Sequence, residues 1–213
     1  EVVLTALKNQ TFSYEGEFWK FPNDNLNPHP HTVYSNYGAG IDQDMTINEI
    51  GIAPRPLQEP HPPLYGGFTM SMKTALFWSQ YGGTPIVLSD NLDFCEALWQ
   101  TYREEAPRHG VEKPKGHEAA WGGIAVCAPT DLQAQQDFED MEWFWDNWAR
   151  QFGQGMPLKL VGSPDTISRQ IEEAHTRLGF DEVFFLIPQG IHSSEQIIES
   201  MDLITNQVMP RFT

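Results

Sequence analysis

A short stretch of the chain, PLYGGFTMSMKT at residues 63–74, combines an apolar run, two adjacent glycines and three Ser or Thr side chains. Thr69, Ser71 and Thr74 stand where a predicted strand gives way to a predicted helix. The first turn of a helix has unpaired backbone N–H groups and a partial positive charge, and nearby hydroxyls add further donors. These residue types at this spacing indicate a binding site for an anion, most often a phosphate.

Two adjacent glycines, Gly66 and Gly67, precede the hydroxyl residues, and both would let backbone approach an anion closely because neither has a Cβ atom. The backbone amide of Met70 would lie beside the hydroxyls. The alternative is that Thr69 or Ser71 simply caps the helix, with no ligand bound. The residues alone leave both interpretations open.

Several polar or aromatic residues lie in or just after the other predicted strands. In parallel α/β proteins, the carboxyl ends of strands carry the chemistry. The candidates are Ser89, Asp90, Trp121, Gln189 and His192. His192 is the catalytic candidate because an imidazole can orient a substrate, although a solvated loop histidine is the alternative. Arg150 follows a tryptophan-rich helix and could be a lid cation or a plain surface arginine.

Histidines in PHPHT (28–32) and at His61 raise the question of a metal site. No cysteine or close carboxylate completes a set of ligands at a familiar spacing, so we expect no metal. The chain also lacks the G-x-S-x-G, P-loop and G-x-G-x-x-G motifs. Their absence disfavours a serine hydrolase, an NTPase and a Rossmann dehydrogenase.

The composition is that of a globular protein, with 213 residues, 40% hydrophobic residues and a formal net charge of −16. Such acidity argues against nucleic acid or an anionic membrane as the partner. No apolar run approaches the ~20 residues of a membrane-spanning helix. Cys95 and Cys127 show no C-x-x-C spacing, which favours two reduced thiols and a cytoplasmic protein.

The elements that must position these residues fall into two regions of what we expect to be a single domain. Region 1–62 should hold a helix at 1–9, a strand or hairpin arm at 11–21, and a long Pro- and Asn-rich connector that could contain a β-ribbon. Region 63–213 alternates between the two kinds of element. The patterns predict strands at 64–68, 84–90, 119–128 and 181–190, and helices at 70–81, 92–105, 131–150, 164–178 and 194–209.

Alternating strands and helices predict an α/β fold with a parallel sheet and right-handed crossovers. Four strands can be counted, whereas a closed (β/α)8 barrel needs eight strands and about 250 residues. The region is therefore either an open four-stranded α/β domain or half of a barrel whose other half is not in this chain.

Three segments of the chain carry a resemblance to a known family. Two stretches that precede them, FSYEGEFWKFPN and PLQEPHPP, add to it. The segments are GGFTMSMKTALFWSQYGGTPIVL, VGSPDTISRQIEEAHTRLGFDEVFFLIPQG and MDLITNQVMPRF. In this order they resemble the carboxyl-terminal part of the luciferase-like flavin monooxygenases. The resemblance covers nearly the whole chain. It implies a (β/α)8 barrel of TIM type, of which this chain supplies the carboxyl-terminal half, about four βα units.

The resemblance also implies a function. Reduced flavin mononucleotide (FMN), delivered by a separate flavin reductase, would react with O₂ and oxygenate a small organic substrate. The phosphate of FMN would lie at Ser71 and Thr74 beside the Met70 amide, with Gly67 and Thr69 in the same turn. The pocket for the substrate would involve Asp90, Trp121, Arg150 and Gln189, with the 22–63 connector shaping it.

The family's catalytic histidine belongs to the first half of the barrel. The resemblance therefore implies a second chain, or an N-terminal segment missing here, that completes the barrel. Two alternatives remain at this point. One is a flavin-binding or structural half-barrel subunit without catalysis, and the other is an oxidoreductase that uses a deazaflavin (F420), whose phosphate would lie at the same turn.

Overall fold

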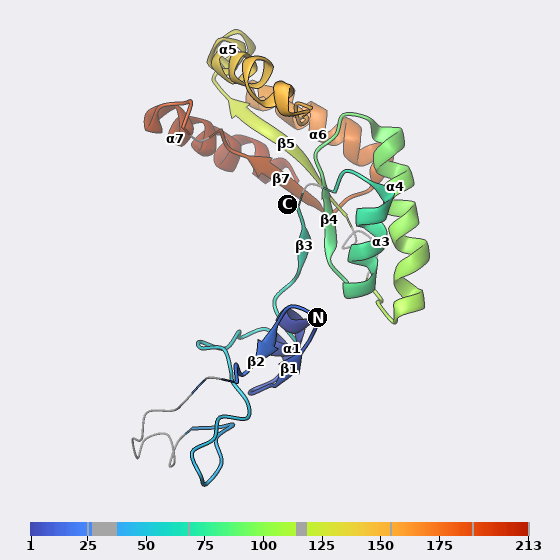
Figure 1. The fold of residues 1–213 in the computed structure, drawn as a ribbon. Helices are drawn as coiled ribbons and strands as arrows, with labels where there is room; N and C mark the ends of the chain where they lie inside the picture. Colours follow the sequence, from blue (N-terminus) through green and yellow to red (C-terminus); the bar gives the residue numbers. More distant parts are fainter. Residues whose placement is uncertain are drawn as a thin grey trace. The chain divides into compact units, whose positions relative to one another are not determined.

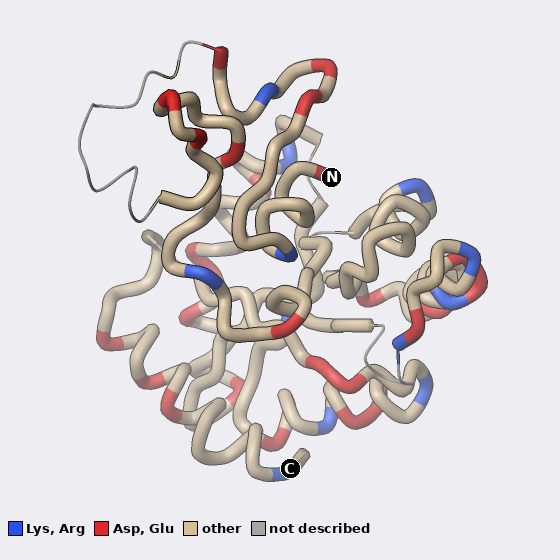
Figure 2. The backbone as a smooth tube through the Cα atoms, turned by 90° about the horizontal axis from the view of Figure 1, so that it is seen from below, with Lys and Arg blue, Asp and Glu red and all other residues tan. Residues whose placement is uncertain are grey.

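The computed structural model describes residues 1–24, 26, 38–67, 69–113, 119–153, 155–188 and 190–212. The chain divides into two compact units, Glu1–Pro63 and Leu64–Thr213, each of which is described by itself. Charged positions of both signs are spread along the described chain, and acidic positions occur in nearly every part of it (Figure 2). None of its described helices combines the length and the apolar character that a membrane crossing requires.

The first unit contains a short helix and a small antiparallel hairpin. Helix α1 spans Val2–Lys8, and strands β1 (Tyr14–Glu15) and β2 (Lys20–Phe21) pair antiparallel. This confirms the helix and the hairpin arm predicted for the start of the chain. Where the β-ribbon was expected, the described residues form only isolated bridges, Phe12 with Ile50 and Ile41 with Ile47.

The second unit alternates strands and helices, as the sequence predicts (Figure 1). Its elements are β3 (Tyr65–Gly66), α3 (Met72–Tyr81), β4 (Thr84–Val87), α4 (Leu92–Glu105), β5 (Ala120–Cys127), α5 (Asp131–Asn147), β6 (Lys159–Gly162), α6 (Pro164–Leu178), β7 (Glu182–Leu186) and α7 (Ser194–Leu203). Short 3₁₀ turns follow α4 and α5, and a π turn at Ile204–Val208 with a 3₁₀ turn at Met209–Arg211 follows α7.

Strand β6 corrects the predicted count of four strands to five. It has only four residues, of which Leu160 and Val161 are its two apolar side chains and Lys159 is exposed. Four residues are too few for hydrophobic periodicity to distinguish a strand from a loop. Its pairing with β5, from Ile124 opposite Lys159 to Cys127 opposite Gly162, is what makes it a strand.

All the pairings within the second unit are parallel, and β5 is the central strand. Strand β7 pairs along residues 120–124 of β5, while β4 pairs at residues 120–121 and β6 at residues 124–127. Since β7 shares partner residues with both β4 and β6, it must occupy the opposite edge of β5 from them. The sheet therefore runs from β3 through β4 and β5 to β7, with β6 extending the β4 edge.

The two faces of this sheet are covered by different helices. Helices α4 and α6 and the π turn after α7 pack on one face, against side chains that include Trp121, Ala125 and Leu160. Helix α5 packs on the other face, where Phe138 and Met141 contact the side chains of Ile124 and Val126. Figure 1 shows α3, α4 and α6 on one side of β4 and β5, and α5 beyond the end of β5. The carboxyl end of the sheet is thus bordered by α5.

Candidate anion site at the start of helix α3

Ser71 and Thr74 are brought together at the first turn of α3. Ser71 is the N-cap residue, with an extended backbone (φ −154°), and its Oγ accepts a hydrogen bond from the Thr74 backbone N–H at 3.3 Å. The two hydroxyl oxygens lie 3.0 Å apart. Ser71 is exposed and Thr74 is half-buried, so a ligand can reach both hydroxyls at the positive end of the helix.

Thr69 has a different environment from the two hydroxyl residues that follow it. Its side chain is fully buried, and its Oγ1 donates to the Gly66 carbonyl at 2.9 Å. Its backbone N–H donates to the Ile86 carbonyl on β4, also at 2.9 Å. Thr69 therefore fastens the turn to the sheet, while Met70 is 61% exposed and stands beside Ser71.

The two glycines have separate roles. A Cβ atom on Gly66 would lie 2.2 Å from the indole nitrogen of Trp78 on α3, whereas one on Gly67 would meet no atom within 4 Å. The expectation that Gly66 makes room for an anion is therefore wrong, because that space is filled by the Trp78 ring. At Gly67 a Cβ would enter open space among the described residues.

A second turn in the same unit has the same Ser-x-x-Thr arrangement and shows what such a turn binds. Ser163 caps α6, and its Oγ accepts from the Thr166 backbone N–H at 3.4 Å. The carboxylate of Asp131 occupies this turn: it accepts from the Ser163 backbone N–H at 2.6 Å and from the Thr166 hydroxyl at 3.1 Å. These bonds hold the pKa of Asp131 below its usual value.

At α3 no acidic side chain from the described residues takes the corresponding place at Ser71 and Thr74. The donors that hold a carboxylate at α6 are thus present at α3 without an internal anion. A phosphate is a suitable occupant because its oxygens accept several short hydrogen bonds at once.

The other residues predicted for the site are not gathered at this turn. Asp90 is exposed after β4. Trp121 is 2% exposed, stacks on Phe180 at 5.3 Å and donates from its indole N–H to the Ser89 carbonyl at 3.0 Å, all of which favours a packing role. Arg150 is paired with Asp146 at 2.7 Å on the surface.

His192 lies in the loop after β7, and Gln189 lies outside the described residues. The Nε2 atom of His192 is buried, and no described residue forms a hydrogen bond with it. Such an unpaired nitrogen keeps His192 as a candidate for a role at this end of the sheet.

A cavity that the sequence did not reveal lies beside the carboxyl end of β7. Its volume is about 670 Å³, and α5 contributes Met141, Phe144 and Trp145 to its wall. The apolar spacing along α5 indicates a buried face but does not distinguish residues that fill a core from residues that line a cavity. Only the position of α5 over the sheet makes this distinction.

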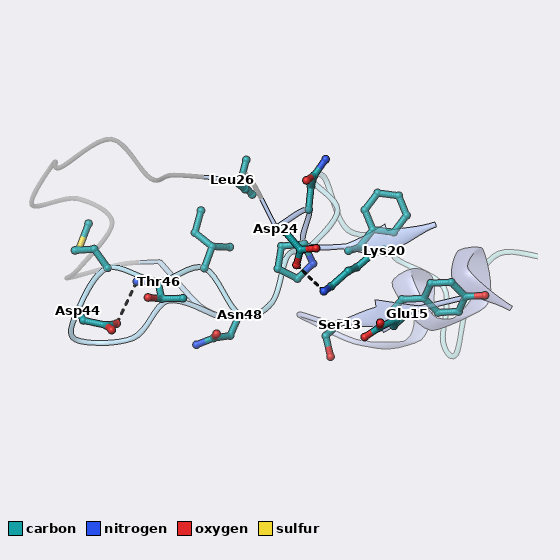
Figure 3. Close-up of a pocket in the computed structure, with 14 residues that line it drawn as sticks. Ser13, Glu15, Lys20, Asp24, Leu26, Asp44, Thr46 and Asn48 are labelled. Atoms are coloured by element: carbon teal, nitrogen blue, oxygen red, sulfur yellow. Dashed lines mark hydrogen bonds and ion pairs between the residues drawn. The ribbon is translucent and has the colours of Figure 1, made fainter. Parts of the chain in front are cut away.

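Another cavity, of about 700 Å³, lies in the first unit between the hairpin and residues 44–48 (Figure 3). Its wall is largely polar. Lys20 pairs with Asp24 at 2.5 Å, and the Thr46 backbone N–H donates to Asp44 at 3.3 Å. Because its lysine is already neutralised by Asp24, this cavity offers an incoming anion less than the α3 turn does.

The histidines considered for a metal differ in what the structure describes of them. PHPHT lies outside the described residues, and His61 Nδ1 is 2.7 Å from the Pro62 carbonyl. The described part of the chain contains no group of three or more His, Cys, Asp or Glu side chains placed to hold a metal ion.

No family model and no curated protein matches the chain. Among solved structures, monooxygenase RslO1 from Streptomyces bottropensis superposes with a TM-score of 0.67 at 15% identity, covering 99% of this chain and 59% of that one. The oxygenating constituent of 3,6-diketocamphane monooxygenase from Pseudomonas putida, in complex with FMN, gives 0.65 at 17% identity, with 100% and 60% covered. Long-chain alkane monooxygenase LadA gives 0.55 at 12%, with 81% and 46% covered.

The chain has the fold of the luciferase-like monooxygenases. At these identities the likeness establishes the α/β fold, which agrees with a partial (β/α)8 barrel. The chain spans 59% and 60% of the length of the first two structures. The first turn of α3 follows β3 and the cavity follows β7, so both lie at the carboxyl end of the parallel sheet, which is where (β/α)8 barrels carry their active sites.

Proposed function

We propose that the chain belongs to an FMN-dependent monooxygenase of the luciferase-like class and that the α3 turn binds the flavin phosphate. The observation that carries this proposal is the pair of hydroxyls of Ser71 and Thr74, 3.0 Å apart at the start of a helix, in a turn of the type that holds Asp131 elsewhere in the unit. The fold supports it, and one superposed structure is an FMN complex.

The residues of the turn would act by binding and orienting the flavin. The hydroxyls of Ser71 and Thr74 and the backbone N–H groups of the first turn donate to the phosphate oxygens, and the helix dipole favours the negative charge. Gly67 leaves the approach open. When bound, reduced flavin supplies the reaction with O₂ that oxygenates an organic substrate.

The proposal includes partners that complete the enzyme. A flavin reductase supplies reduced FMN, and a second chain or an N-terminal segment provides the remaining strands of the barrel. The unpaired edges of β3 and β7 among the described strands are suited to such an addition, since exposed parallel strands can accept further backbone hydrogen bonds. The proposal includes a cytoplasmic location, which is supported by the reduced state of the buried thiols Cys95 and Cys127.

The first experiment compares FMN with riboflavin, which has the same ring but no phosphate. By isothermal titration calorimetry, we expect FMN to bind at least about tenfold more tightly, since hydrogen bonds to a charged group contribute about 1.5–3 kcal/mol each. Ser71→Ala with Thr74→Val should remove most of this preference. Ser163→Ala with Thr166→Val makes the same substitutions in the turn occupied by Asp131 and should preserve it. Equal affinities for FMN and riboflavin would reject the phosphate site.

Catalysis is tested separately. With a flavin reductase and NADH present, the assembled enzyme should consume O₂ in proportion to product formed. FMN binding without any oxygenation would leave a flavin-binding subunit as the answer, and preferential binding of F420 would indicate a deazaflavin oxidoreductase.

A further inference from the structure

The cavity beside the carboxyl end of β7 is lined by uncharged residues, and most of its surface is apolar. Its lining residues are apolar side chains, a proline and a glycine, and none of those described carries a charge: Ile124, Met141, Phe144, Trp145, Phe185, Leu186, Ile187, Pro188, Gly190 and Ile191. Phe144 and Trp145 meet edge to face, with ring centroids 6.4 Å apart and planes at 78°. Two aromatic rings and the Met141 side chain therefore form the wall that α5 contributes.

The cavity lies on the α5 face of the sheet. The lining residues Ile124, Leu186 and Met141 pack together on this face. Phe185 and Ile187 also line the cavity, while their side chains pack against the core of the opposite face. The cavity is thus bounded by β5, β7 and α5.

The cavity and the α3 turn lie at the same end of the sheet, because all its strands are parallel. Three strand spacings separate β3 from β7 along the sheet, roughly 14 Å at about 4.8 Å each. A ligand anchored by its phosphate at Ser71 and a molecule in this cavity would share the carboxyl end of the sheet. The cavity is therefore placed to receive a second molecule next to the flavin.

The lining determines which molecules can enter. A charged group that enters this cavity loses part of its hydration and meets no side chain of opposite charge among the described lining residues, which is unfavourable. An uncharged apolar molecule gains about 25 cal/mol for each Å² of surface that it buries. The volume of about 670 Å³ falls within the range of about 300–1,000 Å³ for sites that bind small molecules.

We propose that this cavity binds the substrate and selects an uncharged, apolar molecule over an ionic one of the same size. Naming the occupant as the substrate rests on the proposed monooxygenase function. The selection against charge rests only on the lining residues.

The test uses two probes with the same ring system, uncharged 2-acetonaphthone and anionic 2-naphthalenesulfonate, titrated calorimetrically into the protein. We expect the ketone to bind at least about tenfold more tightly than the sulfonate. Ile191→Asp puts a carboxylate in the cavity wall and should weaken ketone binding by about tenfold or more. Ile191→Ala, which removes apolar surface without adding charge, should weaken it only by about three- to fivefold.

Ile198→Asp is the matched control, because Ile198 is 58% exposed on α7 and does not line the cavity. It should leave ketone affinity unchanged. Circular dichroism identifies variants that fail to fold, and Ile191→Ala keeps the test decisive if Ile191→Asp is one of them. Equal or tighter sulfonate binding, no ketone binding, or no effect of either Ile191 variant in folded protein would overturn the proposal.

The Ser71→Ala and Thr74→Val double variant separates the two proposals. It should lose its preference for FMN while its affinity for the ketone stays the same. Ketone selection in a protein that shows no phosphate-dependent flavin binding would reject the flavin function and leave the cavity assignment standing. The reverse result would reject the cavity alone.

Discussion

Tyr65 on β3 donates a hydrogen bond to the carboxylate of Glu182 on β7, although β4 and β5 lie between these two strands. In a flat sheet their backbones would be roughly 14 Å apart, too far for the side chains to meet across the surface. The bond therefore requires the sheet to curl toward the face that carries both residues. This curl agrees with a sheet that forms part of a barrel.

The first prediction concerns this pair. Tyr65→Phe should destabilise the second unit by about 1 kcal/mol or less, because Tyr65 is 45% exposed and solvent weakens the bond. The bond to Glu182 raises the pKa of Tyr65 above its usual value of 10.0. Because the pKa of Tyr65 is raised on folding, its contribution to folding stability is fully present below pH 10.0. This contribution is lost as the pH rises through the raised pKa of the folded protein. The free energy of unfolding of Tyr65→Phe, measured with urea from pH 8 to pH 11, should therefore fall less steeply with rising pH than that of the wild type.

Glu182→Gln and the double variant complete a cycle that isolates the pair. If the effects of the two single variants simply add, the bond contributes nothing to stability.

A second prediction contrasts Gly66 with Gly67. Gly66→Ala should destabilise the protein by about 1–3 kcal/mol, because its Cβ would overlap the Trp78 indole. Gly67→Ala should change stability by no more than about 0.5 kcal/mol, since its Cβ enters open space. Thermal unfolding measures both. If Gly67 faces the flavin phosphate, Gly67→Ala should also weaken FMN binding while the fold stays intact.

A third prediction concerns acid stability. Folding lowers the pKa of Asp131 from its usual value of 3.8. Its contribution to folding stability is therefore fully present above pH 3.8 and is lost as the pH falls through the lowered pKa. Asp131→Asn should lower the free energy of unfolding at pH 7 and flatten its fall between about pH 5 and pH 2. Asp140→Asn, an exposed substitution on the same helix, serves as the control. A parallel acid profile for Asp131→Asn and the wild type would contradict the assigned role of this carboxylate.

Local signals in the sequence were sufficient for most of the second unit. Ser163, Pro164 and Gly179 mark the two ends of α6, because a cap, a fixed φ and a left-handed terminator each act within one turn. The Ser71 and Thr74 pair was likewise found because residues three apart meet on a helix.

Contacts between segments that lie far apart in the chain could not be predicted from such local signals. Asp131 meets Ser163 across 32 positions, and Trp78 fills the space beside Gly66 only after α3 packs on β3. Strand β6 depends on its pairing with β5, and the cavity lined by Phe144 depends on where α5 lies over the sheet. Such features follow from tertiary packing, which overrides the local pattern.

The last prediction concerns a buried contact between α7 and β5. Ser200 is 5% exposed, and its hydroxyl oxygen accepts a hydrogen bond from the Cys127 backbone N–H at 2.9 Å. Ser200→Ala leaves that N–H buried without a partner and should cost about 1–3 kcal/mol. Ser194→Ala, an exposed change at the start of the same helix, should cost far less. Chemical denaturation measures both, and hydrogen exchange at Cys127 should accelerate only in Ser200→Ala. Unchanged exchange in that variant would mean that α7 does not secure the end of β5 through this bond.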